Sequence, residues 1–266
     1  MTIEALEGRV YADRPYRLCR EKIDEFVDVT GDERERWTEA APPGFAAALL
    51  FVVAPDLLVD PLVKGAVIHG EQTFTWRRPL VAEAELLVSG TVDRVRTRSA
   101  TSFVTFSLAA SDPDGHVLSG RSTFLVGDSP TPPEPAKEVD VHERAANSSV
   151  SRRLPSPRSA SRADLVRYAA ATRDWNPIHW DRASAIEAGL GGVVVHGLLQ
   201  SAWLTQVAAT VSASARPLES ARFRYTAPLR PAELAEIQGE LSSDRFDLTL
   251  VTGDVTTVSG RFEVAP

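Results

Sequence analysis

The sequence repeats itself at a constant spacing, and this repeat limits the available folds more than any other feature. At an offset of 149 residues, as in 223 minus 74, five residues of the first half lie over five of the second: Phe74, Trp76, Pro79, Leu80 and Gly90 over Phe223, Tyr225, Pro228, Leu229 and Gly239. Both segments have the pattern of a strand, a proline-bounded turn and a second strand. The chain is therefore expected to contain two copies of one fold.

A second match lies near the start of each half. At an offset of 142, as in 174 minus 32, REKIDEFVDVTGD superposes on SRADLVRYAAATRD, which places Asp32 over Asp174. Two independent matches in the same order support a duplication over a chance similarity.

A proline-rich segment separates the two copies. Residues 128–147, DSPTPPEPAKEVDVHERAAN, contain four prolines, many charges and almost no large apolar side chain. Such a segment buries too little apolar surface to fold alone, and its prolines favour an extended spacer. We therefore predict one domain over residues 1–127, a linker over 128–147 and a second domain over 148–266, each domain of ordinary size.

Each half contains a similar order of predicted elements. The first half has a helix over residues 44–53 and strands near 67–77, 83–95, 101–111 and 116–126. The second has a helix around 165–169 capped by Ser161, helices over 181–188 and 197–211, and strands near 221–225, 246–250 and 255–264. A buried helix followed by antiparallel strands predicts an α+β fold in which a curved sheet wraps a long helix.

Composition excludes several classes of function. The chain has 266 residues and a net charge of −7, which argues against duplex nucleic acid or an anionic membrane as the main partner. A single cysteine, Cys19, permits no internal disulfide and no thiolate metal site. The N-terminus lacks the pattern of a signal peptide, and no stretch reaches about 18 consecutive apolar residues. A cytoplasmic location without membrane spans is expected.

The densest group of polar residues lies in RDWNPIHWD, residues 173–181. Asp174 and His179 are five residues apart, and a helix at about 100° per residue would turn them roughly 140° away from each other. Pro177 disfavours a helical conformation at Asn176, so an irregular loop is expected, in which a carboxylate and an imidazole can converge on one small molecule. This pairing is typical of acid–base chemistry.

A second motif, GGVVVHGLLQ, follows at residues 191–200. Gly197 opens the predicted buried helix, where unpaired amides and the helix dipole attract a developing negative charge. Because Gly197 has no side chain, an oxygen atom of a thioester or amide can approach its N–H group. His196 is interpreted as a structural, hydrogen-bonding residue, and no set of side chains has a spacing that requires a metal.

The two motifs together resemble the signature of the MaoC-like, or R-specific enoyl-CoA hydratase 2, family. The resemblance rests on D-W-N-P-I-H-W-D and on V-V-V-H-G-L-L-Q downstream. The first half, with PPGF and HGEQTFTWRRPL, is similar to the degenerate partner domain of two-domain members. This resemblance implies a double hot-dog fold, in which each half is a long central helix wrapped by an antiparallel sheet and the halves pair as a pseudo-dimer.

The resemblance also implies an activity and roles for residues. It makes Asp174 and His179 the catalytic pair that holds the reacting water, Gly197 N–H the donor to the thioester oxygen, and Asn176 a supporting site residue. The implied enzyme is a hydro-lyase of fatty acid metabolism that adds water reversibly to a trans-2-enoyl thioester, giving an R-3-hydroxyacyl thioester. The substrate is an acyl-CoA or acyl-carrier-protein thioester, no cofactor or metal is implied, and a homodimer of the two-domain chain is possible.

The first half departs from the signature. Asp174 aligns with Asp32, but His179 aligns with Trp37, and Pro43-Gly44 replaces His196-Gly197. Proline has no N–H to donate and an indole cannot shuttle a proton as imidazole does, so this copy is expected to be inactive and to supply binding surface. We expect its apolar residues 45–53, including Ala47 and Ala48, to line an acyl tunnel.

Other interpretations stay open at this point. A hot-dog thioesterase would activate water against the thioester carbonyl, and a non-catalytic acyl-binding protein would stabilise a separate dehydratase subunit. Three arginines, Arg222, Arg224 and Arg230, are candidates to bind the phosphates of coenzyme A or phosphopantetheine, or to be solvated residues of a strand face. His69 is expected to hydrogen-bond a strand neighbour. The sequence does not assign the acid and base roles within the pair.

Overall fold

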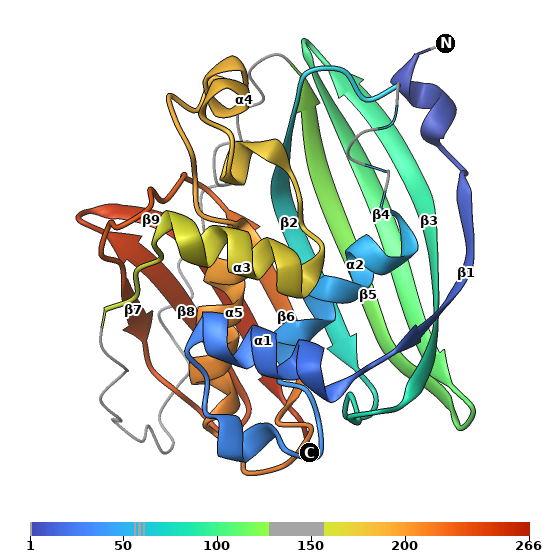
Figure 1. The fold of residues 1–266 in the computed structure, drawn as a ribbon, viewed down its shortest axis with the longest axis vertical. Helices are drawn as coiled ribbons and strands as arrows, with labels where there is room; N and C mark the ends of the chain where they lie inside the picture. Colours follow the sequence, from blue (N-terminus) through green and yellow to red (C-terminus); the bar gives the residue numbers. More distant parts are fainter. Residues whose placement is uncertain (1, 56, 58–59, 61, 128–156) are drawn as a thin grey trace.

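The computed structural model describes residues 2–55, 57, 60, 62–127 and 157–266. The predicted linker, residues 128–147, lies outside the described residues, so the domain boundaries stay predictions. Within the described part the strands form one antiparallel sheet of nine strands, in the order β1-β3-β4-β5-β2-β6-β9-β8-β7 (Figure 1). They are β1 (Val10–Arg17), β2 (Ala66–Trp76), β3 (Glu85–Arg98), β4 (Thr101–Asp112), β5 (Gly115–Gly127), β6 (Leu218–Tyr225), β7 (Glu236–Gly239), β8 (Arg245–Thr252) and β9 (Val255–Val264).

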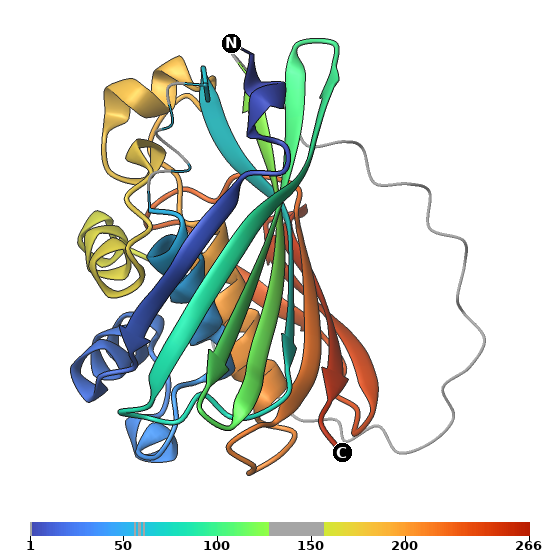
Figure 2. The same ribbon diagram turned by 90° about the vertical axis from the view of Figure 1, so that its right-hand side faces the viewer.

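The helices gather on one face of the curved sheet, as the side view shows (Figure 2). They are α1 (Arg20–Thr30), α2 (Ala46–Val53), α3 (Arg162–Thr172), α4 (Arg182–Glu187) and α5 (Gly197–Ala209). All eight side chains of α2 and most of those of α5 are buried, which explains why both sequences are apolar on nearly every side. No described helix is long and apolar enough to span a bilayer.

The ends of the helices follow from local sequence. Ser161 and Asp164 form a capping box at the start of α3, which confirms Ser161 as the cap. Asp181 caps α4 by accepting from the backbone N–H of Ser184 at 2.8 Å. Gly31 ends α1 in the left-handed conformation, at φ +67°, where glycine avoids the steric cost of a side chain.

The sheet order is nearly symmetric about the β2–β6 pair, as the repeat predicts. β2 is followed outward by β5, β4 and β3, and β6 by β9, β8 and β7. In the first half β1 adds an edge strand along β3. Within the described second half, a single bridge between Arg158 and Ala235 lies at the corresponding place. The sequence patterns did not predict β1, because its side chains are largely exposed and its strand contains Pro15, which is compatible with an edge position.

The two halves join through a short ladder. β2 and β6 pair only over residues 71–75 and 220–224, whereas β2 continues to Ala66 along β5. The change of register at Gly70 bends β2 where the ladder to β6 ends. Because β2 and β6 no longer bond beyond this point, space opens between the halves at the end of the sheet nearest to α4.

Candidate active site

The segment between α3 and α4 carries the predicted acid–base residues. Arg173 ends α3 in the left-handed conformation, and Asn176 then caps a short 3-10 helix, Pro177–His179. The Asn176 side chain accepts from Ile178 N–H at 3.4 Å. The predicted irregular loop is therefore a turn followed by a 3-10 helix, and it brings Asp174 and His179 to one cavity, as the sequence analysis expected.

Both members of the pair are buried, Asp174 at 5% exposure and His179 at 7%. Nδ1 of His179 lies 2.9 Å from the carbonyl oxygen of Val194. A carbonyl only accepts, so Nδ1 carries the hydrogen and Nε2 keeps its lone pair. The ring of His196 stacks on that of His179 with centroids 3.7 Å apart, and its Nε2 lies 3.2 Å from the Asp174 carbonyl, which agrees with a structural role.

Burial shifts the two pKa values in opposite directions. It raises the pKa of Asp174 from 3.8 to about 7, against the opposing effect of the Asn176 backbone N–H. It lowers the pKa of His179 from 6.5 to about 4, against the opposing effect of the Val194 carbonyl. Near neutral pH His179 is therefore a neutral imidazole, and the Asp174 carboxyl is poised between its protonated and ionised forms.

Gly197 begins α5 beside the pair. Within the described residues no carbonyl pairs with its N–H, as expected at the first turn of a helix. A Cβ atom on Gly197 would lie 2.9 Å from the ring of Tyr225, closer than side chains pack. The Tyr225 hydroxyl bonds the Ser201 hydroxyl at 2.7 Å, which fixes the ring. Glycine is therefore required here for the close approach of the ring to the backbone.

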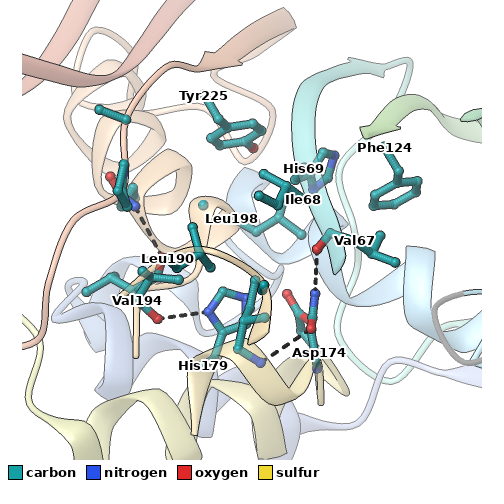
Figure 3. A pocket seen from close by; sticks show the side chains of 18 of the residues that line it. Val67, Ile68, His69, Phe124, Asp174, His179, Leu190, Val194, Leu198 and Tyr225 are labelled. Carbon is teal, nitrogen blue, oxygen red and sulfur yellow. Dashed lines mark hydrogen bonds between the residues drawn. The ribbon is translucent and has the colours of Figure 1, made fainter. Parts of the chain in front are cut away.

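Asp174, Asn176, His179, Gly197 and Tyr225 line one cavity of about 390 Å³, within the range of small-molecule sites. Figure 3 shows the pair on one side of this cavity, with His69, Phe124 and Tyr225 across from it. Residues of both halves contribute to the lining. From the first half come Phe51, Val67, Ile68, His69 and Phe124, and the second half adds, besides the site residues named above, chiefly residues 188–190, 194–195 and 225–228.

One hydrogen bond ties the segment that carries Asp174 and His179 directly to the first half. Nδ2 of Asn176 donates to the carbonyl oxygen of Val67, on β2, at 3.0 Å (Figure 3). Asn176 therefore does more than support its own loop, because it fixes the segment that carries the acid–base pair against the strand that forms the opposite wall.

The corresponding place in the first half is closed. It lies at the other end of the β2–β6 ladder, where a cavity of only about 10 Å³ is lined by residues that include Pro43, Trp76 and Leu218. Trp37, aligned with His179, is 1% exposed and packs into the core. Burial raises the pKa of Asp32, but Asp32 is not among the residues that line this small cavity. The geometry agrees with an inactive first copy.

Three side chains at the site have the composition of a metal-binding group. One donor atom each of Asp174, His179 and His196 lies within 4.8 Å of the others. Carboxylate and imidazole are ligands that zinc accepts. However, Nδ1 of His179 and Nε2 of His196 already bond backbone carbonyls, which leaves only the second nitrogen of each ring for an ion. The expectation that no metal is needed stays a prediction.

The structure also tests what the sequence analysis expected of residues 45–53 and of His69. Of residues 45–53, Phe51 lines the cavity, whereas Ala47 and Ala48 are buried in the core and are not among its lining residues. The tunnel expectation was wrong for these two alanines, which belong to the hydrophobic core. His69 hydrogen-bonds the Glu71 backbone and the Gln72 side chain of its own strand, as the sequence analysis expected, but it also lines the cavity, and no described residue bonds its Nε2.

The three arginines have separate environments. Arg222 and Arg224 both pair with Glu71 on β2, at 3.1 and 3.2 Å, so they bridge the halves on the sheet surface. Arg230 lines the cavity and donates to the carbonyl oxygens of Gly192, at 2.6 Å, and of Leu190. Of the three, only Arg230 lies where it can meet a bound molecule, and it also holds the glycine-rich loop before α5.

Comparison with known proteins gives one family model for each half of the chain. A family model described as FAS1-like, dehydratase domain region matches residues 5–119, and one described as MaoC like domain matches residues 142–259. A UPF0336 protein of Clavibacter michiganensis subsp. michiganensis is 34% identical over 138 residues, which are 46% of this chain and 93% of the relative.

Two solved structures show the fold at low sequence identity. A MaoC-like dehydratase superposes with a TM-score of 0.77 at 23% identity, covering 99% of both chains. A conserved hypothetical protein of Mycobacterium tuberculosis, described as having a double hotdog fold, gives a TM-score of 0.64 at 14% identity over 99% of this chain and 98% of its own. The chain thus has a double hot-dog fold, consists of a FAS1-like dehydratase region followed by a MaoC-like dehydratase domain, and belongs to the family of the UPF0336 proteins.

Proposed function

We propose that the protein is an R-specific enoyl-thioester hydratase, which runs as a 3-hydroxyacyl-thioester dehydratase in the reverse direction. The family supports a reaction of the hydratase or dehydratase type. The observation that carries the proposal is the convergence of Asp174, His179 and Gly197 on one largely apolar cavity, since water addition requires a base, an acid and an oxyanion donor at a single centre.

The hydrogen bond between His179 Nδ1 and the Val194 carbonyl supports one order of proton transfers, with His179 as the base and Asp174 as the acid. Nε2 of His179 removes one proton from water as its oxygen bonds C3 of the enoyl group. The protonated carboxyl of Asp174 gives a proton to C2, so the elements of one water molecule are added. The Gly197 N–H stabilises the enolate-like charge on the thioester oxygen, a contribution of about 3–4 kcal/mol in comparable sites. Proton return from His179 to Asp174 restores the starting state.

This assignment predicts a dependence of kcat/KM on pH. In the active form the Asp174 carboxyl is protonated and the His179 imidazole is neutral. Since burial raises the pKa of Asp174 to about 7 and lowers that of His179 to about 4, activity is expected to be constant between these values and to fall about tenfold per pH unit above 7. Initial rates of hydration from about pH 5 to 9 measure this; a rate that rises through pH 7 would contradict the assignment of Asp174 as the acid.

Gly197→Ala is expected to lower kcat/KM by about 10- to 100-fold, because the new Cβ would lie 2.9 Å from the Tyr225 ring and would displace either the ring or the N–H donor. The matched control is Gly44→Ala in the first half, whose Cβ would meet Ala202 at 3.3 Å, away from the cavity. Steady-state kinetics with a thermal melt of each variant separates lost catalysis from lost stability. Equal activity of the two variants would contradict the oxyanion role.

A single spectrophotometric assay with crotonyl-CoA distinguishes the hydratase from the thioesterase and from the non-catalytic acyl-binding protein. Loss of the conjugated enoyl-thioester absorbance without release of thiol supports hydration, and chiral analysis of the product tests the R configuration. Release of thiol would instead support the thioesterase, and binding without either change would support the acyl-binding partner. Repeating the assay with the matching acyl-carrier-protein thioester identifies the preferred carrier.

A further inference from the structure

The cavity contains a histidine from the first half that the proposed reaction does not use. The ring of His69 lies between those of Phe124 and Tyr225, with centroids 4.7 and 5.0 Å away (Figure 3). Its Nε2 is buried and has no hydrogen-bond partner among the described residues. Burial lowers the pKa of His69 to about 3, so the ring is neutral and can donate or accept one hydrogen bond.

A second polar atom in the same lining is also unpaired. Gln200, on α5, donates from Nε2 to the Val195 carbonyl at 3.3 Å, whereas its Oε1 is buried and no described residue bonds it. Unpaired buried polar atoms are rare in folded proteins, because each loses its bonds to water and gains none in return. Other buried polar atoms among the described residues also lack a partner, for example Nε1 of Trp76. His69 and Gln200 are the residues with such atoms that line this cavity, so a molecule bound there can supply the missing hydrogen bonds.

The internal repeat offers a control for His69. At the offset of 149 residues His69 corresponds to Leu218, and Tyr225 to Trp76. Leu218 and Trp76 both line the closed counterpart of about 10 Å³. A leucine therefore satisfies the packing of this strand position where nothing binds, and the histidine occurs on the side where the cavity is open.

The exposure of the lining shows which part of the substrate His69 meets. Gly189 and Pro228 are exposed to solvent, and this end of the cavity must admit the bulky, charged carrier. Phe51 and Phe124 are each 4% exposed and belong to the buried part of the lining, and the ring of Phe124 lies beside that of the half-buried His69. With the carrier at the open end, the acyl chain beyond the double bond extends toward this buried part.

We propose that His69 binds an oxygen-bearing substituent on the acyl chain and thereby selects oxygenated enoyl thioesters over plain alkyl ones. The inference rests on the proposed hydratase function. A plain alkyl chain would leave Nε2 of His69 buried without a partner. A hydroxyl group can donate or accept and would pair with Nε2 in either tautomer of the ring, whereas a keto oxygen would pair with it only in the tautomer in which Nε2 carries the hydrogen. A site built around such a bond discriminates against a ligand that lacks the oxygen. His69 is a specificity-determining residue in this proposal and takes no part in proton transfer.

The test compares trans-2-enoyl-CoA esters with unsubstituted chains and their keto- or hydroxy-substituted counterparts, with the oxygen on successive carbons beyond the double bond. For the wild-type protein, kcat/KM is expected to be about 10- to 100-fold higher for at least one oxygenated ester than for its alkyl match, mainly through a lower KM. His69→Leu, which copies Leu218, is expected to abolish this preference while keeping turnover of the alkyl esters. His69→Gln, which keeps a hydrogen-bonding side chain, is expected to retain part of it.

The outcomes are distinct. A wild-type preference for alkyl esters, or an equal loss of rate on both classes in His69→Leu, would overturn the specificity role, because a merely structural histidine affects both classes alike. In either case turnover of the alkyl esters would leave the proposed hydratase function standing. Absence of hydration of every ester by the wild-type protein would contradict the hydratase function itself, and with it the role of His69.

Discussion

Asp174→Asn is expected to lower the kcat of enoyl-thioester hydration by about 10²–10⁴-fold, and His179→Ala by a similar factor. An amide cannot give a proton to C2 of the substrate, and alanine offers no base in place of Nε2. The double variant is expected to be no slower than the slower single variant, because the two groups act in one addition of water and losing either stops it. Steady-state kinetics of the four proteins, with circular dichroism to verify folding, measures this. Independent, multiplying losses would show that the pair does not act as a unit.

The same Asp174 variant has a predicted effect on stability. Folding raises the pKa of this carboxyl from 3.8 to about 7, so the ionised form is disfavoured in the folded state. The folded state therefore binds the Asp174 proton more tightly than the unfolded state does. The free energy of unfolding keeps the full contribution of the protonated Asp174 below about pH 3.8 and loses it as the pH rises through about 7, where the folded protein must hold an ionised carboxyl in its interior. Asp174→Asn removes this loss, so its melting temperature is expected to exceed that of the wild type, by more at pH 8 than at pH 5.

An exposed aspartate serves as the control for the thermal melts. Asp114→Asn changes a solvent-exposed turn residue and is expected to shift the melting temperature little at either pH. If Asp174→Asn were no more stable than the wild type at pH 8, the carboxyl would not carry the burial cost assigned to it. A stabilised but inactive variant is the expected signature of a side chain kept for chemistry at the expense of stability.

Asn176→Ala is expected to lower kcat/KM by about 10- to 100-fold, although Asn176 transfers no proton. The substitution removes both the cap of the 3-10 helix and the hydrogen bond to the Val67 carbonyl at 3.0 Å. The acid–base pair would then be held less firmly against the wall formed by β2, and displacement of reacting groups by about 1 Å costs on the order of 10²-fold in rate.

Asn176→Asp separates the two functions of this side chain. Aspartate keeps an acceptor that can cap Ile178 but replaces the donor with an oxygen that repels the Val67 carbonyl. It is therefore expected to lose activity nearly as strongly as the alanine variant. Wild-type activity of Asn176→Asp would show that the cap alone matters and that the bond between the halves has no catalytic role.

Much of the fold could be predicted from the sequence, because the informative patterns were local. Apolar alternation located most strands within a few residues, and helices α2 and α5 have uniformly apolar sequences that match their burial. The constant offset of the repeat also anticipated the symmetric sheet. Strand β1 was missed because an exposed edge strand lacks alternation. The repeated pattern predicted a second strand in the segment that ends at Gly239, and it corresponds to β7, which has only four residues.

The site could be predicted only in part. Asp174, Asn176, His179 and Gly197 lie in two short motifs, and the structure brings all four to one cavity. The first half was expected to supply binding surface, but most of the residues that form its wall were not foreseen, because they depend on where the β2–β6 ladder ends, which is a property of tertiary pairing. His69 was interpreted as a strand residue for the same reason. Its equivalence to Leu218 was the one available signal, and it has meaning only once both cavities are known.

The central claim is that the second half performs the reaction and the first half forms a wall of the substrate cavity. The most direct measurement is the rate of crotonyl-CoA hydration by the full chain with one aspartate changed in each copy, Asp174→Asn or Asp32→Asn. We predict that Asp32→Asn hydrates crotonyl-CoA at the wild-type rate, while Asp174→Asn is slower by about 10²-fold or more. Hydration that survives in Asp174→Asn, or is lost in a folded Asp32→Asn protein, would contradict the account.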